Sequence, residues 1–124
     1  QSEHFGEIRD EVVQLLKYIH DMEISEIEKA IKRCQAYKLE INDYLDIIMI
    51  WYRDVLLYKA TGDERKITFQ DEKMIIKRQA SECSYHGLNT IIQAENTARR
   101  RIACNGNYNL AVELMLLSIK ENIA

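Results

Sequence analysis

Proline is absent from this chain of 124 residues, and glycine occurs only four times. These two residues interrupt helices most strongly, so almost no segment of the chain is forced to break. The three cysteines are an odd number without paired spacing, which fits a reducing cytoplasm better than a disulfide framework. The formal net charge of -3 argues against a dedicated nucleic-acid binder, because phosphate contact needs a positive surface. We therefore expect one folded cytoplasmic domain over residues 1–124, and the first residue, Gln1, suggests a fragment of a longer protein.

Two long apolar runs stand out. Twelve of the fifteen residues from Tyr44 to Tyr58 are apolar or aromatic, which is too long for a strand and typical of a helix. This run contains Arg53 and Asp54 and is too short to span a bilayer, so it predicts a buried helix. The second run, residues 110–119, is also nearly free of polar residues. A helix that is apolar almost all round must be enclosed by other elements or by another subunit, so we expect both helices to be enclosed.

The remaining segments also have helical patterns. One apolar stripe, with alternating spacings of three and four, predicts an amphipathic first helix: Phe5, Ile8, Val12, Leu15, Ile19 and Met22. The expected helix starts are a capping box of Ser25 with Glu28, followed by N-caps at Asn42, Asp71 and Ser84. The expected breaks are Gly62 and the turn Asn105-Gly106-Asn107. The sequence therefore predicts an all-α fold, a single helical bundle of five to six helices with a buried central helix.

No group of residues indicates a reaction centre. Cys83 and His86 have a metal-like spacing, but a structural zinc site needs four ligands, and Cys34 and Cys104 stand alone. Cys83 is therefore interpreted as a buried thiol, and His4 and His20 as surface residues. The chain has no nucleophile elbow, phosphate-binding glycine loop or HExxH helix. We expect no catalytic, cofactor-binding or metal-binding residue.

Two groups of charged residues lie within the helical patterns. Arg99, Arg100 and Arg101 point about 100° apart on a helix, so they predict a solvated face, with Glu95 and Arg99 as an ordinary pair. Arg53 and Asp54 interrupt the buried run, and buried charges are costly unless they are paired. Asp46 lies two helical turns before Arg53, so these two residues share a narrow polar line, which either reaches solvent or faces a neighbouring subunit and fixes its orientation. The spacing leaves both alternatives open.

Three segments carry a resemblance to a known family. They are the end of the long apolar helix, Trp51-Tyr-Arg53-Asp54-Val-Leu-Leu-Tyr58-Lys, then a charged loop with a helix pair, and last Asn105-Gly-Asn107-Tyr-Asn-Leu110-Ala-Val-Glu113-Leu-Met-Leu116-Leu. Together they resemble the C-terminal domain of the delta-prime subunit of bacterial DNA polymerase III, part of the clamp loader. The resemblance covers nearly the whole chain. The first segment is shared with the gamma/tau motor subunits, whereas the last points to delta-prime.

The resemblance implies a function without catalysis. In that family two N-terminal domains of the AAA+ type precede a helical C-terminal domain, which joins the matching domains of other subunits in a collar. The motor subunits hydrolyse ATP, and delta-prime acts as a stator. The implied partners are the gamma/tau and delta subunits, without DNA contact through this domain. The candidate interface or motif residues are Trp51, Arg53, Asp54, Tyr58, Asn105, Asn107, Leu110, Glu113 and Leu116, although Asn105 and Asn107 are better explained by the turn.

Two other functions compete with this one. The first is the equivalent collar domain of a gamma/tau motor subunit, which would also self-associate. The second is a helical nucleic-acid-binding domain that uses Arg99 to Arg101 together with Lys77 and Arg78. The acidic balance of the chain disfavours the second alternative.

Overall fold

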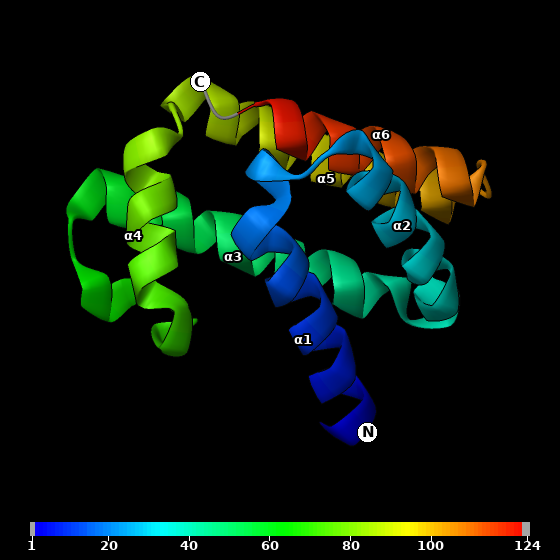
Figure 1. Cartoon of the computed structure of the whole chain (residues 1–124), viewed down its shortest axis with the longest axis horizontal. Helices are drawn as coiled ribbons and strands as arrows, with labels where there is room; N and C mark the ends of the chain where they lie inside the picture. The colour runs from blue at the N-terminus through cyan, green and yellow to red at the C-terminus, as the bar shows by residue number, and fades with distance from the viewer. Residues whose placement is uncertain (1, 123–124) are drawn as a thin grey trace.

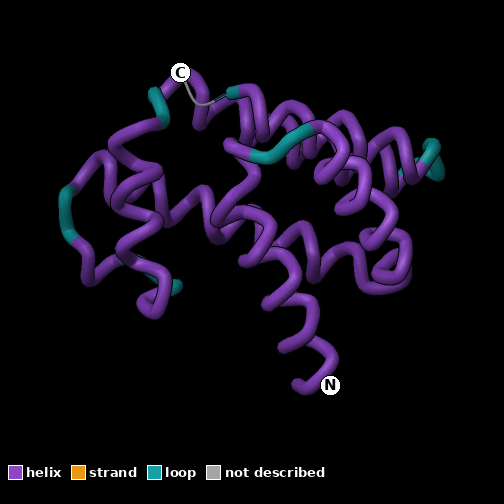
Figure 2. Tube along the Cα trace, in the orientation of Figure 1, coloured by secondary structure: helices purple, strands orange, loops and turns teal. Residues whose placement is uncertain are grey.

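The computed structural model describes residues 2–122, and the fold within them is built from helices joined by short loops. Within them lie six α-helices and four 3-10 helices, and no strand (Figures 1 and 2). The elements are α1 (Ser2–Tyr18), η1 (Ile19–Asp21), α2 (Ile24–Cys34), η2 (Gln35–Glu40), α3 (Ile41–Thr61), η3 (Glu64–Lys66), η4 (Gln70–Glu72), α4 (Lys73–Glu82), α5 (Tyr85–Ala103) and α6 (Tyr108–Glu121). The predicted all-α bundle is confirmed.

Helix α3 is the centre of the bundle. It contacts α1, α4 and α5 and receives η2 at its N-terminal end. Trp51, Tyr52 and Val55 on α3 are almost completely inaccessible to solvent. The prediction of a buried central helix is therefore confirmed, although Asp46 and Arg53 on the same helix reach the surface.

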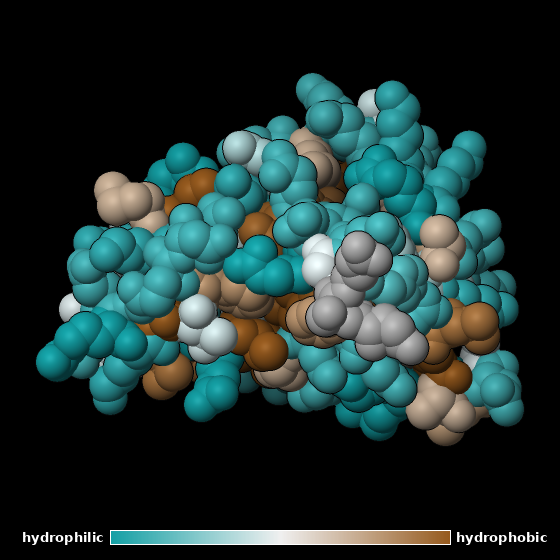
Figure 3. All heavy atoms as spheres, turned by 90° about the horizontal axis from the view of Figure 1, so that it is seen from below, coloured by the Kyte–Doolittle hydropathy of each residue, from teal (hydrophilic) through white to brown (hydrophobic). Residues whose placement is uncertain are grey.

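Helices α5 and α6 form a pair on one side of α3. They lie side by side in Figure 1, and α2 packs against α6. On the opposite side of α3, the first turns of α1 extend beyond the other helices (Figure 1). Seen from below, apolar atoms gather in the middle of this face, between α4 and the beginning of α1 (Figure 3). In the predicted apolar stripe of α1, the interior positions are buried, whereas Phe5 is 43% exposed.

Some predicted helix ends are confirmed. The Oγ atom of Ser84 accepts a hydrogen bond of 2.9 Å from the backbone N–H of Gly87, so Ser84 caps α5. Gly62 ends α3 in the left-handed conformation (φ 68°), and its N–H donates to the carbonyl of Tyr58 at 2.8 Å. Glycine adopts this conformation without steric cost.

Other predicted helix starts are wrong. The capping box of α2 is formed by Glu23 and Glu26, because the extended backbone of Glu23 starts the helix at Ile24 and leaves Ser25 inside it. Asn42 does not cap α3, since η2 leads directly into that helix and its N-cap, Glu40, makes no side-chain bond. Asp71 does not cap α4 either, because a 3-10 turn precedes Lys73. In both cases a 3-10 turn runs directly into the α-helix, so the helix starts without a capping side chain.

Candidate functional site

Three of the candidate residues are buried. Trp51 and Leu116 are fully inaccessible, and Asp54 is 1% exposed. The indole N–H of Trp51 donates to Oε1 of Gln79 at 2.9 Å, and the amide of Gln79 donates to the carbonyl of Leu16 at 2.9 Å. This buried polar bridge connects α3, α4 and α1. In the folded domain, Trp51 and Leu116 serve the core and offer no surface to another subunit.

Asp54 has a structural partner inside the chain. Its carboxylate accepts hydrogen bonds from the backbone N–H groups of Thr68 and Phe69, at distances of 2.9 to 3.0 Å. Backbone donors satisfy a buried carboxylate well. Asp54 therefore faces the loop between α3 and α4, whereas the two residues of the predicted polar line, Asp46 and Arg53, reach the surface. Arg53, the residue before Asp54, forms no ion pair with any side chain of residues 4–122.

Tyr58 lies at the edge of the bundle. Its side chain is half-buried, and Nζ of Lys77 lies 5.7 Å from the centre of its ring. A cation over an aromatic face is a favourable contact. Part of the ring remains available to another molecule.

The asparagine motif shapes the turn before α6. Asn105 adopts a left-handed conformation (φ 59°), and the N–H of Gly106 donates to the carbonyl of Arg101 at 2.8 Å. The side chain of Asn107 caps α6 by accepting a bond of 3.0 Å from the N–H of Leu110. The two asparagines thus have structural roles, as the turn interpretation predicts.

The rest of the domain does not enclose helix α6 on all sides, which leaves the other predicted alternative, enclosure by another subunit, as a prediction. Leu110 is 49% exposed and Leu114 is 41% exposed, and both leucines lie on the same side of the helix because four residues separate them. Leu114 also lines a hollow of about 260 Å³ between α5 and α6, together with Ala94, Ala111 and Ser118. Leucine side chains beside small residues form an apolar surface that another helix could cover.

Glu113 borders a different hollow on the same helix. This hollow, of about 510 Å³, lies between α6 and α2, and Lys29, Ile31 and Lys32 line its other side. Glu113 is exposed at this edge. Two sides of α6 therefore have surface features that could meet a partner.

The run of Arg99, Arg100 and Arg101 was predicted to form a solvated face, and Arg99 departs from this prediction. Arg99 pairs with Glu95 and, at 3.0 Å, with Asp46 on α3, whereas Arg100 and Arg101 are exposed. Glu95 is 1% exposed, so its pairing with Arg99 is not the ordinary surface pair that the spacing predicts. Burial raises the pKa of Glu95, and one of its oxygens, Oε1, has no hydrogen-bond partner among the described residues. The basic run contributes one pair to the α3–α5 contact.

Neither the cysteines nor the histidines form a metal site. Cys83 is buried, as expected, and burial raises the pKa of its thiol to about 11. Within residues 2–122, no three His, Cys, Asp or Glu side chains come together in a way that could hold a metal ion. His4 is exposed as predicted, but His20 is half-buried, with its Nε2 atom 3.2 Å from the hydroxyl of Tyr52. The prediction for His20 is wrong because the 3-10 turn after α1 folds this residue against α3.

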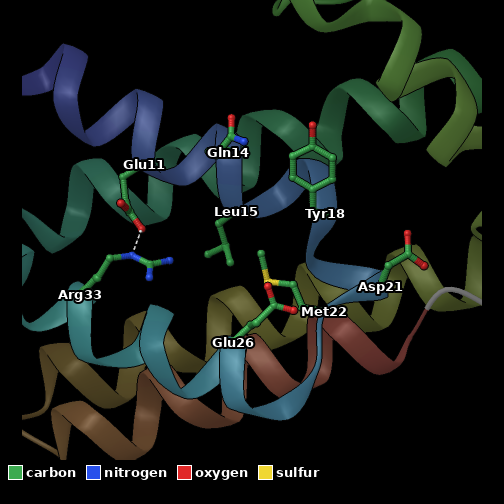
Figure 4. Close-up of a pocket in the computed structure, with 8 residues that line it drawn as sticks. All are labelled: Glu11, Gln14, Leu15, Tyr18, Asp21, Met22, Glu26 and Arg33. Carbon is green, nitrogen blue, oxygen red and sulfur yellow. Dashed lines mark hydrogen bonds and ion pairs between the residues drawn. The ribbon is translucent and has the colours of Figure 1, made fainter.

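A further hollow lies between α1 and α2, and no sequence motif indicated it. Its volume is about 460 Å³. Leu15 and Met22 form its apolar floor, and the ring of Tyr18 stands at one side (Figure 4). Glu11 and Arg33 form an ion pair of 2.8 Å across one end. The sequence spacing could not reveal this hollow, because it depends on the angle at which the loop after η1 returns the chain.

The described part of the chain has no helix that is both long and apolar enough to cross a membrane. No curated protein and no solved structure matches the chain significantly. A family model described as "DNA polymerase III, delta subunit, C terminal" matches residues 7–121, which is nearly the whole chain. The chain therefore belongs to this family, and it is a C-terminal domain of a DNA polymerase III clamp-loader subunit.

Proposed function

We propose that this domain is the collar domain of a delta-prime stator subunit, and that it joins the gamma/tau and delta subunits of a bacterial replicative clamp loader. The family match over residues 7–121 carries the proposal at the level of the clamp loader. The segment from Asn105 to Glu113 supports the assignment to delta-prime. The parent protein then carries two AAA+ type domains before residue 1, and this domain contributes assembly without catalysis.

The exposed face of α6 supports the assembly role. Leu110 and Leu114 are large apolar side chains that remain accessible although the domain has a well-filled core. Exposed apolar side chains that cluster on one face often mark a surface for another protein. The small residues Ala94 and Ser118 beside them would let a partner helix approach closely. Arg101 lines the same hollow and supplies a charged edge, as the rims of subunit interfaces commonly have.

The proposal restricts the candidate interface to the surface residues. Leu110 and Glu113 belong to the proposed interface on α6. On α3, Arg53 is exposed and Tyr58 is half-buried. Trp51, Asp54 and Leu116 act through the core, because they are buried. Asn105 and Asn107 act through the turn that positions α6.

The experiment is reconstitution of the clamp loader from the parent subunit and the gamma/tau and delta subunits of the same organism, followed by size-exclusion chromatography. We expect the wild-type subunit to enter the complex, and the variant with Leu110→Asp and Leu114→Asp to be excluded. Leu39→Asp is the matched control, because Leu39 is 96% exposed on η2 and does not line the hollow between α5 and α6. Circular dichroism must show that all three proteins are folded. Entry of the double variant at wild-type level would overturn the interface, and failure of the folded wild-type subunit to enter would overturn the proposed function.

A further inference from the structure

The hollow between α1 and α2 has a chemistry of its own. It measures about 460 Å³, which lies in the range of small ligand sites. Its floor is apolar, because Leu15 and Met22 lie at the bottom (Figure 4). Tyr18 stands beside this floor and is 46% exposed, so a large part of its ring faces solvent. An aliphatic or planar group could therefore contact both the floor and the ring.

The edge of the hollow is acidic. Glu11, Asp21 and Glu26 line it, with Arg33 as the one cation among the lining residues. Arg33 is occupied by Glu11, since its Nε atom lies 2.8 Å from Oε2 of that carboxylate. Neither Asp21 nor Glu26 forms an ion pair within residues 2–122. Two carboxylates at the edge of the hollow thus lack a cationic partner.

Lys17, the residue before Tyr18, pairs with a carboxylate outside this hollow. Lys17 lies over the ring of Tyr18, at 5.8 Å from its centre, but its Nζ atom pairs with Glu72 at 3.2 Å. Glu26 also accepts a bond of 3.1 Å from the backbone N–H of Glu23, through Oε1. Its second oxygen is not engaged by this capping bond. A concave surface lined by one sign of charge concentrates the field and attracts the opposite charge.

From this geometry we infer that the hollow between α1 and α2 binds an arginine side chain from a segment of a partner protein, with an apolar residue next to the arginine. The guanidinium group is planar, stacks on aromatic rings and forms paired hydrogen bonds with carboxylates. Its aliphatic stem suits the floor of Leu15 and Met22. The carboxylates repel phosphate groups, so nucleic acid and anionic lipid are excluded as occupants. The hollow is formed by α1 and α2, and the inference does not depend on the α6 interface.

The test uses N-acetyl-leucyl-arginine amide as the probe and follows the amide resonances of the ¹⁵N-labelled chain by NMR. We expect saturable shifts at Gln14, Tyr18, Asp21 and Glu26, which weaken as salt is added. The analogue with citrulline replacing arginine has nearly the same shape without the charge, and we expect it to cause no shifts. Equal binding of the citrulline analogue would overturn the inference, since it would show that shape alone is recognised.

The matched variants are Asp21→Asn with Glu26→Gln, and Glu28→Gln as the control. Glutamine at position 26 can still accept the capping bond from Glu23, so the start of α2 should persist. Glu28 is exposed on the same helix and does not line this hollow, so its variant removes a charge without touching the site. We expect the double variant to bind the arginine probe about tenfold more weakly, because two partly shielded charge contacts are lost. Unchanged binding by the double variant, with α2 intact by NMR, would contradict the inference.

Discussion

The carboxylate of Asp54 on α3 accepts a hydrogen bond of 3.0 Å from the backbone N–H of Phe69, fifteen residues further along the chain. Through this bond and the two bonds from Thr68, a buried charge fixes the loop that leads to α4. Phe69 in turn packs against Trp51, with ring centres 5.8 Å apart. The adjacent residues Arg53 and Asp54 therefore differ in role: Arg53 lies at the surface, and Asp54 organises the core.

Asp54→Ala should lower the free energy of unfolding by about 2–4 kcal/mol, because the backbone N–H groups of Thr68 and Phe69 lose their acceptor. Urea unfolding followed by circular dichroism measures this difference. Arg53→Ala is the matched control, and we expect it to change stability by no more than about 0.5 kcal/mol because Arg53 is exposed. Equal effects of the two substitutions would contradict the anchoring role of Asp54.

Gln79→Leu should destabilise the domain by about 2–4 kcal/mol. Leucine has a similar size but leaves the indole N–H of Trp51 and the carbonyl of Leu16 without their partner, and unpaired buried polar groups are costly. Loss of stability should be accompanied by a change in the fluorescence of Trp51, the single tryptophan of the chain. Arg78→Leu, an exposed neighbour on α4, controls for the substitution type. A stable Gln79→Leu variant would show that the bridge contributes little.

Replacement by alanine should have opposite effects on the stability of the domain at Gly87 and at Gly6. A Cβ atom at Gly87 would overlap the backbone carbonyl oxygen of Asn122, so Gly87→Ala should destabilise the contact between α5 and the end of α6, by about 1–3 kcal/mol. At Gly6, inside α1, a Cβ atom meets nothing within 4 Å. Gly6→Ala should therefore stabilise the domain by about 0.5–1 kcal/mol, through the higher helix propensity of alanine. Thermal unfolding of both variants checks the two signs.

The stability of the domain should depend on pH through His20. Burial lowers the pKa of His20 below its ordinary value of 6.5, because the charged imidazolium is poorly solvated there. The unfolded chain then binds more protons than the folded domain at pH values just below 6.5, so stability falls as the pH drops through that region. His20→Gln should remove this part of the pH dependence in urea unfolding.

His4 acts in the opposite direction and serves as the control. Its hydrogen bond with Glu40 raises the pKa of His4, so its contribution is present at low pH and is lost as the pH rises through the raised value. A His4→Gln variant should therefore lose more stability on acidification than the wild type does. If His20→Gln and wild type show the same slope below pH 6.5, another group governs the acid sensitivity.

The sequence predicted those features that depend on local pattern. The central helix, the cap at Ser84, the end at Gly62 and the turn at Asn105 all follow from residues within a few positions of one another. It failed where a preceding 3-10 turn replaced a cap, as at Asn42 and Asp71. The apolar pattern of α6 also could not show whether the helix is covered by the rest of the domain or leaves a side exposed for a partner. Burial of Glu95 and His20 depends on packing between helices distant in sequence, which no spacing encodes.

Leu116 and Leu114 provide the last prediction, because they lie two residues apart on α6 with opposite environments. Leu116 is fully buried, and Leu114 is 41% exposed beside the hollow between α5 and α6. Leu116→Ala should cost about 2–5 kcal/mol in the isolated domain, since it removes packed side-chain volume from the core. Leu114→Ala should change stability by no more than about 0.5 kcal/mol, because its methyl groups already contact water. Tyr58→Ala, at the edge of α3, should fall between them, since its side chain is half-buried. Urea unfolding of the three variants gives the order. A large loss for Leu114→Ala would mean that this side of α6 belongs to the core of the domain, and it would remove the physical basis for an interface there.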